Sequence, residues 1–356
     1  MAQQSQDAKD QGQGFKNHVE NIAIVGATGR IGAFITQELL KTKKHKVTAL
    51  TRADSSSSNK LATVAGLTIQ PVNYDEPESL VSALRGQEVL IITMAVTAPP
   101  DQEAKLIRAA AEAGVAWVMP NEWGLDPWNE ALAQESYLGD ARKKARDLIV
   151  SLGKSAYISL VCGMWYEFSL SGGPERYGFD LPNRTVTFFD DGNTKVNTST
   201  WEQCGRAMAR LLSLKVVADD TNDNNSTTTN TTTTTTTPTL SQFKNGFVYI
   251  SSFLLSQRDM FQSVLRATAT SEADWSVKYQ DVKTRYNEGL VEMQKGTVAG
   301  FVQVLYSRYF YPDGSGCHEA RHGLHNDLLG LPKEDLDHRT KLAIVMAEEG
   351  ESAGRV

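Results

Sequence analysis

Three glycines at intervals of three residues are the strongest chemical signal in the sequence. Gly26, Gly29 and Gly32 follow an apolar run at 21–25, and an amphipathic stretch at 34–40 comes next. A strand, a tight glycine turn and a helix in this order let the backbone approach a pyrophosphate, which the N–H groups and dipole of the helix N-terminus attract. This pattern predicts a dinucleotide site. Its expected contacts are Gly26, Thr28, Gly29, Arg30, Ile31 and Gly32.

The residue type after the second expected strand indicates which dinucleotide binds. In NAD-binding proteins an acidic residue about 20 positions after the glycine motif holds the ribose 2′-hydroxyl. Here the strand at 46–50 runs into Arg52, and no acidic residue precedes it in the strand. A guanidinium suits a 2′-phosphate, which a carboxylate would repel. We therefore predict NADP(H) as the cofactor; the alternative is that Arg52 is only an exposed loop arginine.

A parallel sheet is needed to position these residues. From Val19 onward apolar runs and amphipathic stretches alternate, which is typical of βαβ units. Strands are expected at 21–25, 46–50, 67–72, 88–93, 115–119 and 155–161, and helices at 34–40, 78–84, 101–113 and 133–152. The sequence thus predicts an α/β fold with a Rossmann-like doubly wound parallel sheet. Thr93 and Met94, which end the fourth strand, are expected beside the nicotinamide ribose.

Beyond residue 163 the alternation stops. Short strands and helices predict a smaller mixed α/β domain on the substrate side, with strands at 185–189 and 246–251 and helices at 200–214, 257–268, 279–295 and 298–309. The expected organisation is a disordered tail at 1–18, a dinucleotide-binding domain at 19–163 and a substrate-side domain at 164–350. The stretch at 219–239 is rich in Thr and Asn, has little to bury and is expected to be a disordered insert.

Composition narrows the class of protein. The 356 residues carry a net charge of −6 without a dominant basic face, which argues against a general nucleic-acid or membrane-surface protein. We find no apolar run of about 18 residues and no apolar N-terminal signal. The cysteines Cys162, Cys204 and Cys317 are odd in number and far apart. We therefore expect no disulfide framework and a reducing, cytoplasmic location.

One further segment completes a resemblance to a known family. Residues 120–124 read Pro-Asn-Glu-Trp-Gly, which is similar to the Pro-Ser-Glu-Phe-Gly motif of the NmrA-like and isoflavone reductase-like proteins, a branch of the atypical short-chain dehydrogenases/reductases. The glycine turn at 26–32 and Arg52 fit the same branch, and the likeness runs from about Val19 to Leu214. Within the branch the chain most resembles fungal isoflavone reductase-type oxidoreductases. The resemblance implies NADPH-dependent reduction of phenolic or other secondary-metabolite substrates.

The resemblance also implies where a proton donor belongs. The family's reductases carry a catalytic lysine in a pattern like Lys-x-x-(Val/Ile)-Arg-Arg, and matched on Arg146 this position holds Arg142. Arginine does not release a proton near neutral pH, whereas a buried lysine can titrate into range. Lys143, and after it Lys144, are the candidate proton donors. The alternative is that this cluster is a solvated basic helix face.

Aromatic residues after the sixth strand are candidates for a substrate pocket. Trp165, Tyr166 and Phe168 follow a strand whose end faces the cofactor in a doubly wound sheet. Tyr166 is also a candidate proton donor, and Glu122 and Trp123 are expected to border the same pocket. The alternative for the aromatic residues is packing between the two domains.

Half of the six histidines gather near the C-terminus. His318, His322 and His325 lie close to Cys317 and Glu319. Zinc sites prefer four ordered Cys, His or carboxylate ligands. No second half-site accompanies the cluster and the family implies no metal, so we predict a polar surface and no metal there.

The leading prediction is an NADPH-dependent reductase that passes a hydride to a carbonyl or conjugated double bond of an aromatic small molecule. The alternative is a non-catalytic NADP-binding regulator of the NmrA type, which acts through a protein partner and needs different affinities for the oxidised and reduced cofactor. Arg142 at the lysine position motivates this alternative. An isomerase or dehydratase that uses the cofactor transiently is a third option.

Overall fold

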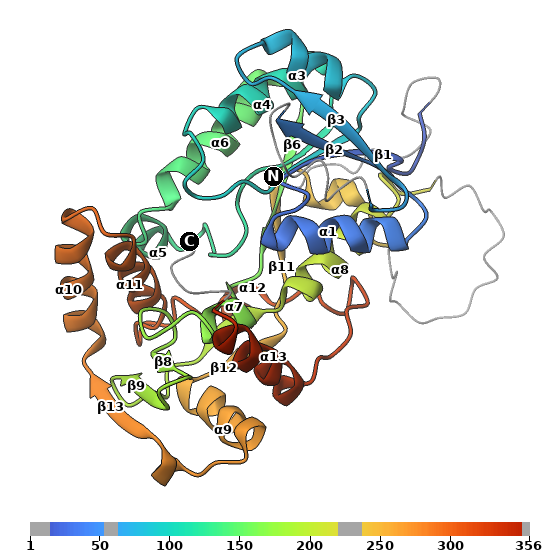
Figure 1. Cartoon of the computed structure of the whole chain (residues 1–356). Helices are drawn as coiled ribbons and strands as arrows, with labels where there is room; N and C mark the ends of the chain where they lie inside the picture. Colours follow the sequence, from blue (N-terminus) through green and yellow to red (C-terminus); the bar gives the residue numbers. More distant parts are fainter. Residues whose placement is uncertain (1–14, 53–62, 220–236, 351–356) are drawn as a thin grey trace, which may run out of the picture.

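A seven-stranded parallel sheet forms the centre of the computed structural model, which describes residues 15–52, 63–219 and 237–350. The strand order is β11-β6-β5-β4-β1-β2-β3 (Figure 1). The strands are β1 (Asn21–Val25), β2 (Lys46–Arg52), β3 (Leu67–Val72), β4 (Val89–Ile92), β5 (Trp117–Met119), β6 (Ala156–Val161) and β11 (Gly246–Tyr249). The predicted Rossmann-like doubly wound sheet is confirmed.

Helices cover both faces of this sheet (Figure 1). They are α1 (Arg30–Lys41), α3 (Pro77–Leu84), α4 (Gln102–Ala113), α6 (Gly139–Leu152) and α8 (Trp201–Leu212). Successive side chains of a strand point to opposite faces. Ile22 and Ile24 of β1 accordingly pack in one core cluster with α1 and α8. Ala23 and Val25 pack in another with α3, α4 and α6, so both faces of β1 are buried and its run is apolar throughout.

Two elements beyond the expected domain boundary at residue 163 pack with the main sheet. The strand expected at 246–251 is β11, which pairs in parallel with β6 from Gly246 opposite Ile158 to Tyr249 opposite Val161. It therefore extends the main sheet, and α8 likewise returns to pack on α1. Tertiary packing, and not the residues of a short strand, determines which strand it pairs with. The sequence pattern therefore placed β11 in the wrong part of the chain.

Two predicted disordered segments lie largely outside the described residues. Of the tail at 1–18, the structure describes residues from Phe15 onward, and there Asn17 donates a hydrogen bond to Val217 O at 3.0 Å and accepts one from Val217 N at 2.9 Å. Of the insert at 219–239, the described part includes Thr239, which is buried and pairs with Lys215 in a β-bridge. Thr239, at the end of the predicted insert, therefore belongs to the packed part of the chain.

The second part of the chain has a mixed architecture, as expected. Two three-stranded sheets, β12-β10-β7 and β13-β9-β8, pack with helices around an aromatic core. The elements are β7 (Met164–Trp165), α7 (Tyr166–Leu170), β8 (Phe179–Asp180), β9 (Thr185–Phe189), β10 (Val196–Ser199), β12 (Phe253–Leu255), α9 (Gln257–Thr268), β13 (Ser276–Gln280), α10 (Val282–Gln294), α11 (Val298–Tyr309), α12 (Glu319–His322) and α13 (Leu336–Glu348). Helices α9 and α11 occupy the predicted ranges. Within the described ranges, every helix is too short or too polar to cross a bilayer.

The helix expected at 133–152 is broken into two. The first piece is α5 (Glu130–Glu135), which begins at Asn129, whose side chain accepts a hydrogen bond from Leu132 N at 3.1 Å. Tyr137 then adopts a φ of 59°, a left-handed conformation that stops a helix, and α6 starts at Gly139. The break allows the segment from 125 to 139 to fold over the side of α6.

A buried cluster of charged residues holds α13 against α7 and α8. Arg339 lies 3.4 Å from Glu167 Oε1 and 2.7 Å from Glu334 Oε1, and it also contacts Glu202. The second oxygen of Glu167 is buried and has no hydrogen-bond partner among the described residues. Burial raises the pKa of Glu167 to about 7.

Glu167→Gln is expected to reduce the pH dependence of stability. The native pKa of about 7 lies above the ordinary value of 4.5. The folded state therefore binds more protons between these values, and the free energy of unfolding falls as the pH rises through them. The loss should be on the order of 2–3 kcal/mol between pH 5 and pH 8. Urea unfolding at both pH values should show this loss in the wild type and most of it absent in the variant. A control, Glu112→Gln at an exposed site, should keep the wild-type dependence, and a Glu167 variant that also keeps it would contradict the account.

Candidate cofactor and substrate site

The glycine turn is built by close backbone contacts. Gly26 has a φ of +81°, and Gly29 N donates a hydrogen bond to Gly26 O at 2.8 Å. A Cβ atom on Gly26 would lie 2.1 Å from Thr93 O, and one on Gly32 would lie 2.1 Å from Gly26 O. These distances leave no room for a side chain, so the turn requires glycine at both positions.

The turn leads directly into the N-terminus of α1. Gly29 is the N-cap, and the first turn of α1 holds no acidic residue that could compete with a phosphate. The first N–H groups of a helix have no intrahelical acceptor, so they and the helix dipole favour an anion there. Thr28 is exposed beside this end of the helix, whereas Ile31 is buried in the core. The cradle fits a pyrophosphate.

The first residue of α1 also reaches the second part of the chain. The Arg30 guanidinium lies 4.4 Å from the ring centre of Phe168 in α7, and the Arg176 guanidinium lies 3.7 Å from the same ring. Trp165 packs against Phe168 with ring centres 5.9 Å apart. The structure therefore brings the predicted residues Arg30, Trp165 and Phe168 together at the edge of the glycine turn.

Arg52 lies at the carboxyl end of β2 and is exposed. It lines a cavity of about 510 Å³ together with Tyr74, Asp75 and Lys105. Lys105 forms ion pairs with Asp101 at 2.8 Å and with Asp75 at 3.5 Å, whereas no ion pair of Arg52 occurs within the described ranges. The carboxyl ends of β1 and β2 lie on the same edge of the parallel sheet, so Arg52 and the glycine turn lie on the edge where such sheets bind ligands.

Arg52→Ala is expected to weaken NADPH binding about 10- to 100-fold, because a hydrogen-bonded contact with a charged group contributes roughly 1.5–3 kcal/mol. NADH lacks the 2′-phosphate, so its affinity should change little. Titration calorimetry with both dinucleotides measures the two effects. Arg85→Ala is a matched control, since Arg85 is also exposed but is paired with Glu78. Equal losses for NADPH and NADH would show that Arg52 does not contact the 2′-phosphate.

Hydrogen bonds fix the ends of β4 and β5 beside the glycine turn. Thr93 Oγ1 donates to Val25 O at 2.7 Å. Asn121 bridges both backbone groups of Met94, accepting from Met94 N at 3.0 Å and donating to Met94 O at 3.1 Å. Glu103 in turn accepts from Asn121 N at 2.7 Å, and burial raises the pKa of its carboxyl. Sequence reasoning missed Asn121 and Glu103, although Asn121 lies within the motif at 120–124.

Glu122 and Trp123 are both buried, but Trp123 packs in the core and Glu122 lines a cavity. Trp123 belongs to the core, and its indole N–H donates to Ile92 O at 2.8 Å, so it packs inside the sheet layer and does not line the α6 cavity described below. Glu122 is 2% exposed, accepts a hydrogen bond from Ser159 Oγ at 2.9 Å and forms an ion pair with Arg146. Glu122 also lines a cavity beside α6.

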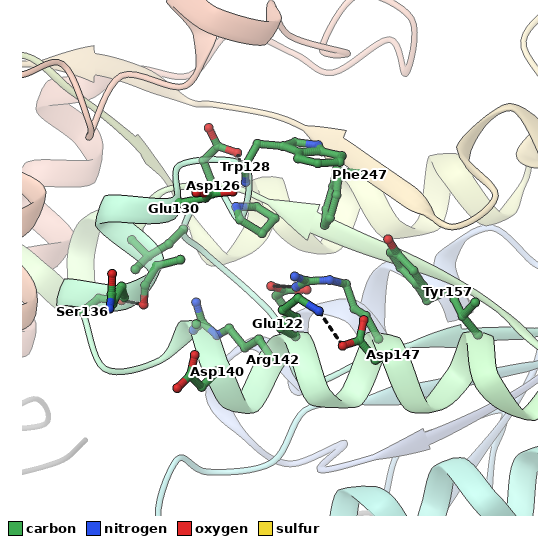
Figure 2. A pocket seen from close by; sticks show the side chains of 18 of the residues that line it. Glu122, Asp126, Trp128, Glu130, Ser136, Asp140, Arg142, Asp147, Tyr157 and Phe247 are labelled. Carbon is green, nitrogen blue, oxygen red and sulfur yellow. Dashed lines mark hydrogen bonds and ion pairs between the residues drawn. The ribbon is translucent and has the colours of Figure 1, made fainter. Parts of the chain in front are cut away.

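This cavity, which we call the α6 cavity, has a volume of about 650 Å³. It lies between α6 and the segment from 125 to 139, and Figure 2 shows Arg142 on the helix below and Asp126, Trp128 and Glu130 on the segment above. Tyr157 and Phe247 line it from β6 and β11. A volume of this size suits a small organic molecule.

The candidate proton donors differ in their surroundings. Lys143 lines the α6 cavity but is largely exposed and pairs with Asp147 at 2.6 Å. Lys144 is exposed and does not line the cavity. Tyr166 is fully buried, and its hydroxyl lies 2.7 Å from Thr340 Oγ1. Burial raises the pKa of Tyr166, so its position argues against proton transfer to a substrate.

Arg142 lies on the inner side of the same helix. Its guanidinium makes no hydrogen bond or ion pair with any described residue, although Glu122 and Glu103 lie near enough to stabilise its charge. Burial lowers its pKa. Arg142 therefore presents free donors to the α6 cavity.

The three histidines at 318, 322 and 325 each make a hydrogen bond within the protein. His318 Nε2 lies 3.0 Å from Ile250 O, His325 Nδ1 accepts from Tyr249 N at 3.0 Å, and His322 Nε2 lies 2.9 Å from Asp126 Oδ2. Within residues 15–52, 63–219 and 237–350, no three His, Cys, Asp or Glu side chains are placed to share a metal ion. The contact of His322 holds Asp126 at the edge of the α6 cavity.

Comparison with known proteins shows which sequences this chain resembles. The sequence model of the NmrA-like family matches residues 18–170. The oxidoreductase aprR of Aspergillus flavus is 23% identical over 322 residues, which cover 89% of this chain and 96% of that protein. A probable pinoresinol-lariciresinol reductase 3 of Arabidopsis thaliana is 28% identical over 178 residues, which cover 49% of this chain and 57% of that protein.

A solved structure gives the same fold over almost the whole chain. AtPrR2 with NADP+ and (+)pinoresinol matches with a TM-score of 0.69 at 20% identity, covering 92% of this chain and 100% of that one. At this identity the likeness establishes the fold. The predicted resemblance is thereby confirmed: residues 18–170 match the NmrA-like family, and the similar proteins are named an oxidoreductase and a pinoresinol-lariciresinol reductase.

Proposed function

We propose that this protein is an NADPH-dependent reductase of an aromatic small molecule. The observation that carries the proposal is the shared edge of the sheet, where the glycine turn, the N-terminus of α1 and Arg52 converge. Backbone N–H groups at Arg30 and Ile31 would hold the pyrophosphate, and Arg52 would hold the 2′-phosphate. Thr93 and Met94 would adjoin the nicotinamide, which supplies the hydride when it is bound.

In this proposal the substrate lies in the α6 cavity, which Glu122 lines just after the end of β5. Glu122 and Arg142 line its inner end, and the aromatic residues of β6 and β11 line its outer part. The related proteins support a reductase, since they are named an oxidoreductase and a pinoresinol-lariciresinol reductase. The acceptor group is a carbonyl or a conjugated double bond, the groups to which a nicotinamide can add a hydride.

Lys143 is the proposed proton donor, because it lines the cavity and Lys144 does not. An exposed lysine could act through water at the mouth of the cavity. Lys143→Met should lower turnover without changing NADPH affinity. Unchanged turnover in this variant would remove Lys143 from the mechanism.

A second function remains a candidate because Arg142 stands where reductases of the family carry lysine. A non-catalytic regulator would bind NADPH and NADP+ with different affinities and pass the difference to a protein partner. NADPH oxidation, followed by absorbance with a panel of aromatic enones and quinones, separates the two functions. Protein-dependent oxidation supports the reductase, whereas tight NADPH binding without oxidation supports the regulator. For either function we propose a cytoplasmic location, which suits three free cysteines.

A further inference from the structure

The α6 cavity has one wall of aromatic side chains. The rings of Trp128 and Phe247 meet edge to face with centres 5.8 Å apart, and Phe247 lies 5.9 Å from Tyr157. Trp128 is 68% exposed, which is unusual for so large an apolar side chain. Such a wall favours a flat ring, because aromatic pairs gain energy beyond the area they bury.

The opposite side of the cavity carries a cation, Arg142, whose donors have no partner among the residues that the structure describes. Glu122 uses one oxygen for Arg146 and the other for Ser159, and Glu103 accepts a hydrogen bond from Asn121. Arg142 makes none of these contacts and lines the cavity. A guanidinium matches a carboxylate with two parallel hydrogen bonds, so an anionic ligand would supply the partner that Arg142 lacks among the described residues.

The segment that faces α6 is held in place at both ends. Asp126 contacts His322 at 2.9 Å and accepts a hydrogen bond from Tyr249 at 3.2 Å. At the other end Glu135 pairs with the buried Arg308, and its backbone oxygen accepts a hydrogen bond from Tyr286 at 2.9 Å. The cavity is therefore preformed, and binding would require little reordering of the chain.

We propose that the α6 cavity binds an aromatic carboxylic acid, with its carboxylate on Arg142 and its ring against Phe247 and Tyr157. Five acidic residues also border the cavity. Three of them are paired, Glu122 with Arg146, Asp147 with Lys143 and Asp126 with His322. The other two, Glu130 and Asp140, are exposed and are screened by solvent. The two unpaired acids, Glu130 and Asp140, oppose an anion at the rim, whereas the inner end holds Arg142 and a Glu122 that is already paired, so the carboxylate is favoured beside Arg142. The proposal rests on the proposed function in one respect, since it makes the aromatic acid the class of substrate.

Titration calorimetry on the full chain, without cofactor, tests the site. The probes are cinnamate, its neutral analogue cinnamamide and its cationic analogue cinnamylamine. Cinnamate is expected to bind at least about tenfold more tightly than either analogue, as a charge-assisted contact implies. Arg142→Met should remove this preference and leave cinnamamide binding unchanged. Lys144→Met is the matched control, because Lys144 is a neighbouring cation outside the cavity, and it should keep the preference.

Several results would overturn the proposal. They are equal binding of cinnamate and cinnamamide, tighter binding of cinnamylamine, no binding of any probe, and an unchanged cinnamate preference in Arg142→Met. NADPH affinity and the thermal midpoint of Arg142→Met, measured in parallel, show whether this variant is folded. A second variant, Arg142→Lys, keeps the charge and should retain part of the preference for cinnamate over cinnamamide. If the wild-type protein does not bind NADPH, the proposed function is contradicted. Cinnamate could still bind in that case, so the two proposals fail separately.

Discussion

Gly32→Ala is expected to lower the affinity for NADPH at least about 100-fold, which corresponds to about 2.7 kcal/mol of binding free energy. The new Cβ atom would lie 2.1 Å from Gly26 O and 2.5 Å from Thr93 Oγ1. Gly26 O is backbone and already accepts a hydrogen bond from Gly29 N, so it cannot rotate away as a side chain could. The start of α1 would have to move off the turn. Its N–H groups would then no longer converge on the pyrophosphate.

Titration calorimetry with NADPH measures this loss, and circular dichroism shows whether the variant still folds. Gly114→Ala is the control, because Gly114 ends α4 with a φ of +79° and open space around its Cα. That substitution should cost on the order of 1 kcal/mol of stability and leave NADPH affinity unchanged. A folded Gly32→Ala protein that binds NADPH like the wild type would place the cofactor elsewhere.

Glu122→Ala is expected to lower the free energy of unfolding by about 3–5 kcal/mol, because it leaves the charge of Arg146 buried without its partner. Glu122 is 2% exposed, the Arg146 side chain is 13% exposed, and Ser159 would also lose its acceptor. Arg142 would lose one of the two carboxylates that stabilise its charge. The change acts on stability and on the shape of the α6 cavity together.

A double-mutant cycle isolates the contact. Glu122→Ala, Arg146→Ala and the double variant should give a coupling energy of at least about 1.5 kcal/mol in urea unfolding. The Lys143–Asp147 pair on the same helix is the matched control, since its side chains are 67% and 62% exposed. Its coupling energy should be about 0.3–0.5 kcal/mol. Similar coupling energies for the two pairs would show that the Glu122 contact does not depend on burial.

Local features of the sequence were sufficient to predict the glycine turn and the helix that follows it. The glycine turn, the helix that follows it and Arg52 lie within one βαβ unit, where each residue type has a steric or electrostatic requirement of its own. Gly26 and Gly32 could be recognised because no other residue type fits against backbone oxygens at 2.1 Å. The strand and helix pattern on which the fold prediction depended is likewise local.

The substrate half depends on contacts between distant segments. His322 and Tyr249 position Asp126 from the other part of the chain, and Phe247 reaches the α6 cavity only because β11 joins β6. The pattern of residues 142–146 shows a basic helix, but not that Arg142 faces inward while Lys143 pairs with Asp147 at the surface. The side on which a helix packs is set by its neighbours. For the same reason the sequence does not show that the indole of Trp123 packs in the core.

The affinities of the wild-type protein for NADPH and NADH, measured side by side by titration calorimetry, test the central claim most directly. The geometry of the glycine turn and Arg52 predicts that both bind and that NADPH binds at least about tenfold more tightly, since NADPH alone offers a 2′-phosphate to a guanidinium. Equal affinities would contradict the assignment of Arg52, and failure of both dinucleotides to bind would contradict the cofactor site itself.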